Sequence, residues 1–115
     1  MKAPDLKEVI AGHESRNREL CKLIETKGAD LATKRPIDLH FWADGELAAQ
    51  RLADALRERG WSHLELDPTE DGGVWNVEVH IEASVTEVVD PSLTEELVRL
   101  AKDNQSEFDG WGTSI

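Results

Sequence analysis

The chain has 115 residues, of which 39% are hydrophobic and 32% are charged, a balance typical of a soluble globular protein. This length predicts one domain that folds without disulfides, and the only cysteine, Cys21, excludes an intrachain disulfide or a multi-cysteine metal site. The net charge of −11 falls on the later part, where residues 63–115 hold 13 acidic residues against only Arg99 and Lys102; such a surface repels nucleic-acid phosphates and attracts basic partners.

Residues 1–36 are predicted to form a long helix and a linker in front of the main domain. Apolar residues recur at helical spacing after Pro4 and before Gly28, and Gly28 and Pro36 then mark the linker. The N-terminal residues interleave charged and apolar side chains, and no apolar run approaches the length of a membrane span. We therefore expect a cytoplasmic protein that does not bind a membrane.

Residues 37–115 are predicted to form the main domain, which begins with a strand and a helix. Residues 37–43 alternate apolar and polar side chains, the two-residue period of a strand with one buried face. Asp44 is then predicted to cap the N-terminus of a helix that Gly60 ends.

The remaining residues predict a hairpin, a second helix of the domain and a last strand. Strands are expected over residues 61–67 and 75–83, because the Pro-Thr-Glu-Asp-Gly-Gly sequence between them suits a hairpin turn. Ser92 and Glu95 match a capping box and predict a helix start, and residues 107–113 form the last strand. The order βαββαβ predicts an α+β fold, a ferredoxin-like sandwich with an additional N-terminal helix, whose sheet order 4-1-3-2 places the last strand beside the first.

Two tryptophans, Trp42 and Trp61, fall on the face of the predicted sheet that the two inner helices leave uncovered. Such large apolar side chains favour cover from solvent. The apolar stripe of the first helix needs a partner as well. We therefore expect the first helix to cover this face, in preference to a partner protein or a second copy of the chain.

Three of the four histidines fall on the same face of the predicted sheet. The register expected for the hairpin places Glu78 across from His63, close enough for a cross-strand pair. Because imidazole and carboxylate ligands suit zinc or non-haem iron, a metal site using His40, His80 and a carboxylate is the alternative to an ordinary solvated polar face.

The C-terminal sequence Glu-Phe-Asp-Gly-Trp-Gly-Thr, residues 107–113, is the most unusual stretch of the chain. Glycines cost backbone entropy in a strand and pack nothing, so Gly110 and Gly112 indicate a close approach of backbones around Trp111. This sequence resembles the signature of the regulator of ribonuclease activity B (RraB) family, and a looser resemblance extends over residues 37–101. The resemblance implies a small non-enzymatic protein that binds and inhibits ribonuclease E.

We therefore expect an acidic regulatory protein without catalytic residues or cofactors, which binds a basic protein segment and does not bind nucleic acid directly. The resemblance implies ribonuclease E as the source of that segment. Trp111 has two compatible interpretations, an anchor of the fold and a docking residue. The alternatives are a metal- or small-molecule-binding protein and a module for an unrelated protein partner, such as an immunity or antitoxin-like domain. The predicted partner-binding residues are Glu107, Asp109, Trp111, Glu78 and Glu82.

Overall fold

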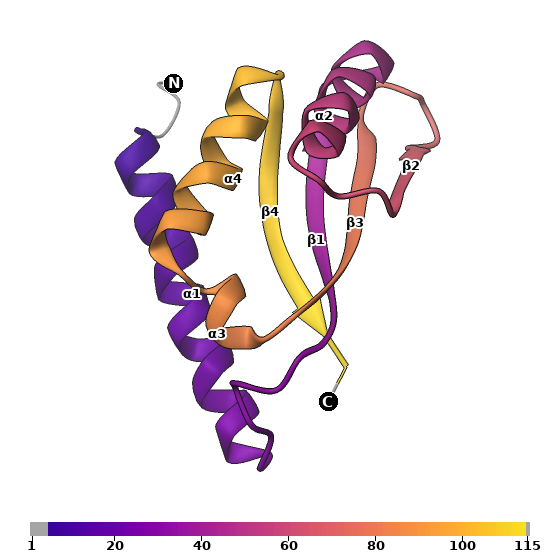
Figure 1. Ribbon diagram of the computed structural model, residues 1–115. Coiled ribbons are helices and arrows are strands. Elements are labelled where there is room, and N and C mark those ends of the chain that lie inside the picture. The colour runs from indigo at the N-terminus through magenta and orange to yellow at the C-terminus, as the bar shows by residue number, and fades with distance from the viewer. Residues whose placement is uncertain (1–4, 115) are drawn as a thin grey trace.

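In the computed structural model, which describes residues 5–114, helices and strands alternate around one four-stranded sheet (Figure 1). The fold class is α+β with an N-terminal helix. Among the described residues, no helix combines the length and the apolar character that a membrane span requires. The elements are α1 (Leu6–Thr26), β1 (Arg35–Ala43), α2 (Glu46–Glu58), β2 (Leu64–Pro68), β3 (Trp75–Ala83), α3 (Val85–Val88), α4 (Pro91–Asp103) and β4 (Ser106–Thr113).

The four strands form an antiparallel sheet in the order β2-β3-β1-β4, so β1 lies between β3 and β4. Read from β4, this is the order 4-1-3-2, and the C-terminal signature segment lies beside β1 as expected. Two helices are additional to the βαββαβ elements. Helix α1 packs against α4, and the short helix α3 precedes α4. Helix α3 is not anticipated by the sequence patterns.

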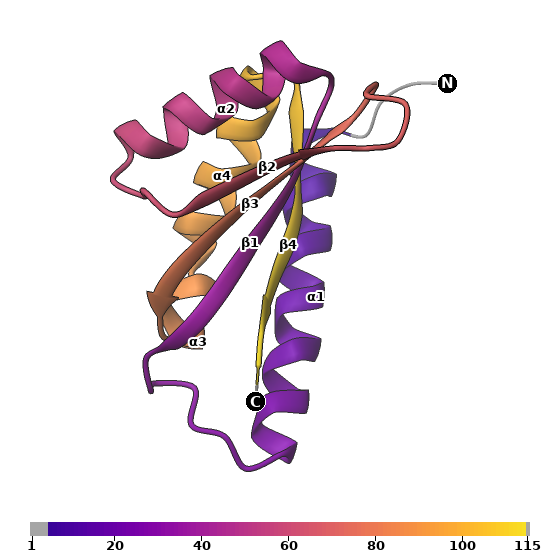
Figure 2. The same cartoon turned by 90° about the vertical axis from the view of Figure 1, so that its right-hand side faces the viewer.

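The inner face of the sheet carries the hydrophobic core, as its alternating pattern predicts. Helices α2 and α4 lie over this face, on the same side of the sheet (Figure 2). Burying each large aliphatic or aromatic side chain contributes about 1.5–3 kcal/mol, so this face supplies much of the folding free energy. The completely buried strand residues are Ile37, Leu39, Phe41, Val77 and Val79.

Helix α1 does not cover the opposite face of the sheet, so the prediction for Trp42 and Trp61 is wrong. The helix packs against α4 and lies beyond the free edge of β4 (Figures 1 and 2). Two polar residues of its stripe, His13 and Asn17, are buried there. The physical reason is that these polar side chains find partners on β4 and α4, whereas the outer face of the sheet offers mainly charged groups.

Trp111 provides the main polar link between β4 and α1. Its indole Nε1 donates a hydrogen bond of 2.8 Å to Oδ1 of Asn17, whose Nδ2 lies 3.4 Å from Oγ1 of Thr94 on α4. The ring of His13 stacks on Phe108 with ring centroids 4.8 Å apart. Burial, and secondarily the Arg16 guanidinium, lower the pKa of His13 and so favour the neutral imidazole that accepts a 3.0 Å hydrogen bond from Arg16.

The β2–β3 hairpin forms, but its register differs from the expected one by two residues. Glu65, rather than His63, lies across from Glu78, so the predicted His63–Glu78 pair does not form. Strand β2 begins only at Leu64. Trp61 therefore lies in the loop before β2, where the Arg59 guanidinium sits 4.5 Å from the centroid of its ring.

Two of the predicted helix caps are also wrong. Helix α2 has Gly45, with φ of 101°, at its N-cap in place of Asp44, and no side chain caps it. Helix α4 begins at Pro91 and is capped by Asp90, whose carboxylate accepts from the Ser92 amide. Proline suits the first helical position because it lacks an amide hydrogen that would need a partner there.

Candidate functional site

The outer face of the sheet carries six carboxylates and is not covered by any helix in the described chain (Figure 2). Alternation along the strands directs these side chains away from the core. Within residues 5–114, no outward strand position holds a lysine or an arginine. We call this surface the acidic face, and its carboxylates are those of Asp38, Glu65, Asp67, Glu78, Glu82 and Glu107.

One end of the acidic face carries an exposed tryptophan. Trp42 keeps 39% of its surface in solvent and lies between Asn76 on β3 and Glu107 on β4. A shallow pocket of about 520 Å³ opens beside it and is also lined by Val74, which is equally exposed. An exposed aromatic side chain next to carboxylates is typical of a surface that binds another protein.

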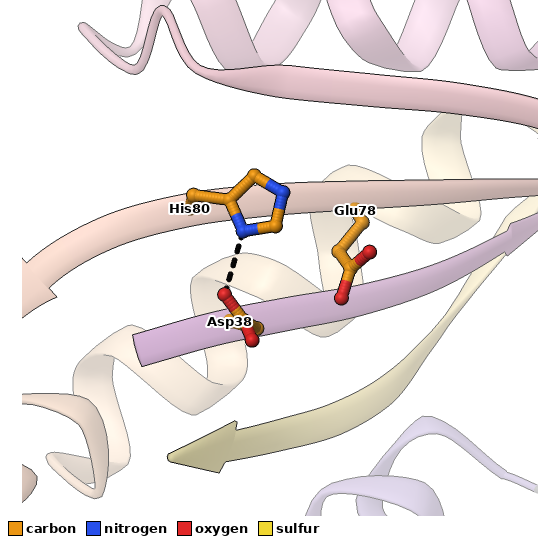
Figure 3. Close-up of side chains that lie close together, drawn as sticks. All are labelled: Asp38, Glu78 and His80. Atoms are coloured by element: carbon orange, nitrogen blue, oxygen red, sulfur yellow. Dashed lines mark hydrogen bonds and ion pairs between the residues drawn. The ribbon is translucent and has the colours of Figure 1, made fainter. Parts of the chain in front are cut away.

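The middle of the acidic face contains a cluster of imidazoles and carboxylates on β1 and β3. His80 and Asp38 are directly opposite in the register, and Nδ1 of His80 lies 2.6 Å from Oδ1 of Asp38 (Figure 3). Glu78 occupies the same face two residues before His80, and its Oε1 lies 3.3 Å from Nδ1 of His40. The hydrogen bond that Nδ1 of His80 donates to Asp38 raises the pKa of His80, and the charges of Asp38, Glu78 and Glu65 act in the same direction.

The glycines of the signature segment have a different role from the expected close approach of backbones. A β-bulge shifts the register between His40 and Phe41, and Gly110 lies there with φ of 128°, a conformation that other residues rarely adopt. An added Cβ at Gly110 would meet nothing within 4 Å. An added Cβ at Gly112 would lie 3.8 Å from Nε2 of His40, an ordinary contact. The bulge allows both Phe108 and Trp111, three positions apart, to reach the buried layer.

The predicted partner-binding residues fall into three groups. Glu78, Glu82 and Glu107 lie on the acidic face, as their strand positions require. Asp109 is exposed at the bulge, where it borders small pockets that also include Arg16 of α1. Trp111 is only 8% exposed and is hydrogen-bonded inside the fold, so its position favours the anchor interpretation.

Sequence reasoning placed Trp42 on the outer face but did not include it among the binding residues. The signal was present, because Trp42 is the one tryptophan that alternation places outward within a central strand. The prediction that α1 covers this face excluded Trp42 from the predicted binding residues. Its exposure could be inferred only after α1 had been placed elsewhere.

The fold and this surface define a class: an α+β domain whose main surface feature is an acidic, uncovered sheet face with an aromatic side chain at one end. Residues 14–113 match the family model described as Regulator of ribonuclease activity B. The chain therefore belongs to the RraB family, whose members are non-enzymatic regulators of ribonuclease E. A search of curated proteins finds no match to the chain.

Proposed function

We propose that this protein regulates ribonuclease E by binding a basic segment of that enzyme on the acidic face. Membership of the RraB family supports ribonuclease E as the partner. The observation that carries the binding mode is the set of six outward carboxylates without a lysine or arginine among the outward strand positions of residues 5–114. A surface of one sign attracts a segment of the opposite sign and speeds its association.

Trp42 supplies an apolar contact with the partner, which the carboxylates of the acidic face cannot provide. Its ring and the neighbouring Val74 are exposed beside the pocket at the end of the acidic face. Buried aromatic side chains commonly dominate the free energy of protein association, while charged residues around them set orientation. We assign Trp42 as the aromatic anchor, in the role that the signature suggested for Trp111.

The proposed mechanism is occlusion of a surface that otherwise binds RNA. Nucleic-acid binding depends on lysine and arginine side chains that neutralise phosphates. The carboxylates of Glu78, Glu82 and Glu107 would pair with those side chains in place of phosphate. Inhibition then needs no chemistry from this protein, and we place its action in the cytoplasm.

Ionic strength provides the test of this binding mode. Screening shortens the reach of exposed charges from about 10 Å at 0.1 M salt to about 3 Å at 1 M. We expect the affinity for purified ribonuclease E to fall steadily across such a salt series, measured by calorimetry or surface plasmon resonance. An affinity that stays constant across the series would contradict charge pairing, and an absence of binding at low salt would contradict the choice of partner.

A further inference from the structure

We propose that Asp38, Glu78 and His80 form a binding site for one divalent transition-metal ion, such as Zn²⁺, in the middle of the acidic face. This inference does not depend on the proposed binding of ribonuclease E. It differs from the metal-site alternative drawn from the sequence, because His40 lies outside the ligand set. None of these three side chains belongs to the hydrophobic core.

The three side chains present one ligand atom each within a small volume. These atoms all lie within 4.8 Å of one another. A zinc ion binds imidazole nitrogen and carboxylate oxygen at about 2.0–2.2 Å, so ligand atoms around it are separated by roughly 3–4 Å. To close the set, the flexible Glu78 side chain turns toward His80, and the ion takes the place of the 2.6 Å hydrogen bond between His80 and Asp38, whose atoms then separate to the ligand spacing. In Figure 3 the dashed line joins Nδ1 of His80 to Asp38, and the Glu78 carboxylate lies to one side of this pair.

Two further residues lie beside the ligands, at the positions that outer-shell residues occupy around metal ligands. The second ring nitrogen of His80, Nε2, lies 3.5 Å from Oε1 of Glu65 on β2, and it makes no hydrogen bond within the described residues. A carboxylate behind a metal-bound imidazole is a recurring arrangement, because it fixes the ring orientation and raises its basicity. His40 stands 3.3 Å from Glu78 and orients that carboxylate in the same manner.

The scaffold and the charge of the surface favour a cation at this position. The ligands stand on the adjacent strands β1 and β3, which hold them more firmly than loops would. The remaining carboxylates of the acidic face add a negative potential that attracts a divalent ion. One imidazole with two carboxylates suits zinc better than magnesium, which prefers an all-oxygen shell with several waters.

Calorimetric titration of the untagged protein with ZnCl₂ tests the site. We expect one Zn²⁺ to bind per chain at about pH 8, with little or no heat from MgCl₂ under the same conditions, and tighter Zn²⁺ binding as the pH rises because the ion displaces the imidazole proton. His80→Ala and Asp38→Asn should each weaken Zn²⁺ binding by more than about tenfold, since even outer-shell changes cost 10–100-fold at metal sites. Both positions are partly exposed, and circular dichroism checks that the variants fold.

Two matched controls separate a built site from general attraction to negative charge. His63→Ala removes an exposed imidazole next to β2, and Glu82→Gln removes an exposed carboxylate further along β3. Both variants should weaken Zn²⁺ binding far less than the ligand variants do, because neither side chain contacts the ion. The proposal is overturned if no Zn²⁺ binds, if His80→Ala binds it unchanged, or if the two controls weaken binding as much as the ligand variants do.

Discussion

Replacing Trp111 by alanine should lower the free energy of unfolding by about 3–5 kcal/mol, the range for removing a buried aromatic side chain. Trp111 is 8% exposed and packs in the core cluster, while its indole nitrogen donates to Asn17. The substitution therefore creates a cavity and leaves the Asn17 carbonyl oxygen without its donor. For a domain of this size the melting temperature should fall by roughly 10–20 °C, measured by calorimetry.

Two further variants separate the cavity from the lost hydrogen bond. Trp111→Phe keeps an aromatic ring and removes the indole N–H, and it should cost about 1–3 kcal/mol for the buried acceptor left unpaired. Trp42→Ala removes a tryptophan from the exposed face, and its melting temperature should change little in comparison. A Trp111→Ala protein as stable as the natural one would refute the role of the Asn17 contact in holding α1.

Replacing Trp42 by alanine should weaken binding to ribonuclease E by about 30-fold, which corresponds to the roughly 2 kcal/mol typical of an interface hot spot. Trp42 is one of the few large hydrophobic side chains that the described structure leaves exposed, and it borders carboxylates on the same face. Covering the ring with a partner removes apolar surface from water. The fold should remain intact because the core lies on the opposite face of β1.

Trp61→Ala is the matched control for this prediction. Trp61 is also partly exposed, but it lies in the loop before β2 with its ring against Arg59, and it borders Glu82, at the opposite end of β3 from Trp42. Its removal should leave the affinity for ribonuclease E nearly unchanged. Equal losses from both tryptophans, or no loss from Trp42→Ala, would show that the aromatic anchor is misplaced.

The elements and their order could be predicted because their signals are local. Strand β3 has the bounds expected from its alternation, and residues 37–43 fall within β1. The pairing of the C-terminal segment with β1 followed from the number and order of strands, since few sheet topologies accommodate βαββαβ. Such patterns depend on residues that are close in the sequence, so they can be recognised without knowledge of the tertiary structure.

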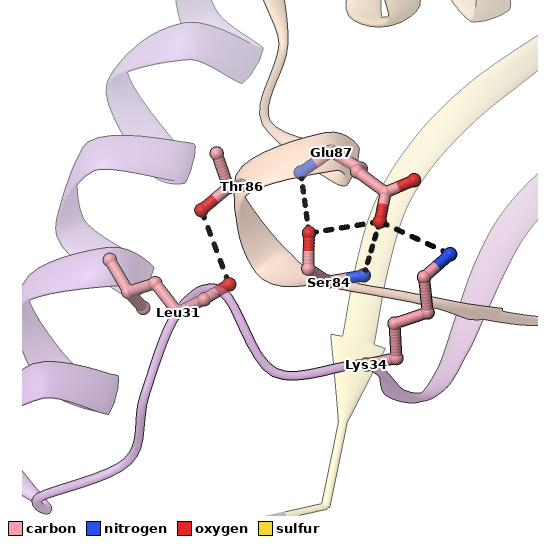
Figure 4. A network of polar contacts seen from close by, with 5 residues as sticks. All are labelled: Leu31, Lys34, Ser84, Thr86 and Glu87. Atoms are coloured by element: carbon pink, nitrogen blue, oxygen red, sulfur yellow. Dashed lines mark hydrogen bonds and ion pairs between the residues drawn. The ribbon is translucent and has the colours of Figure 1, made fainter.

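The start of α4 shows how two capping signals can compete. Ser84 and Glu87 form a true capping box at α3, where the Ser84 side chain meets the Glu87 amide and Glu87 accepts from Ser84 (Figure 4). The same turn is tied to the linker after α1, because Lys34 pairs with Glu87 and Thr86 bonds to the Leu31 carbonyl. The sequence contains both motifs, but Ser92 is already inside α4, because Asp90 caps that helix and Pro91 begins it.

The position of α1 and the register of the hairpin could not be derived from the sequence. The apolar stripe of a helix can pack on either side of a sheet. The position of α1 depended on the pairing of buried polar residues such as Asn17 and Trp111, which lie 94 residues apart in the sequence. The hairpin register moved by two residues, which keeps every side chain on its own face. Alternation with a period of two therefore identified the side chains of the acidic face, but it did not identify which of them are opposite one another.

The most direct test of the account neutralises the acidic face and measures the affinity for ribonuclease E. A Glu78→Gln, Glu82→Gln, Glu107→Gln variant removes three charges from that face, and a Glu46→Gln, Asp54→Asn, Glu58→Gln variant removes three from the exposed side of α2. At about 0.5 kcal/mol for each exposed pair, the first variant should bind about tenfold more weakly, while the second should bind like the natural protein. Equal affinities for the two variants would contradict the claim that this face binds the enzyme.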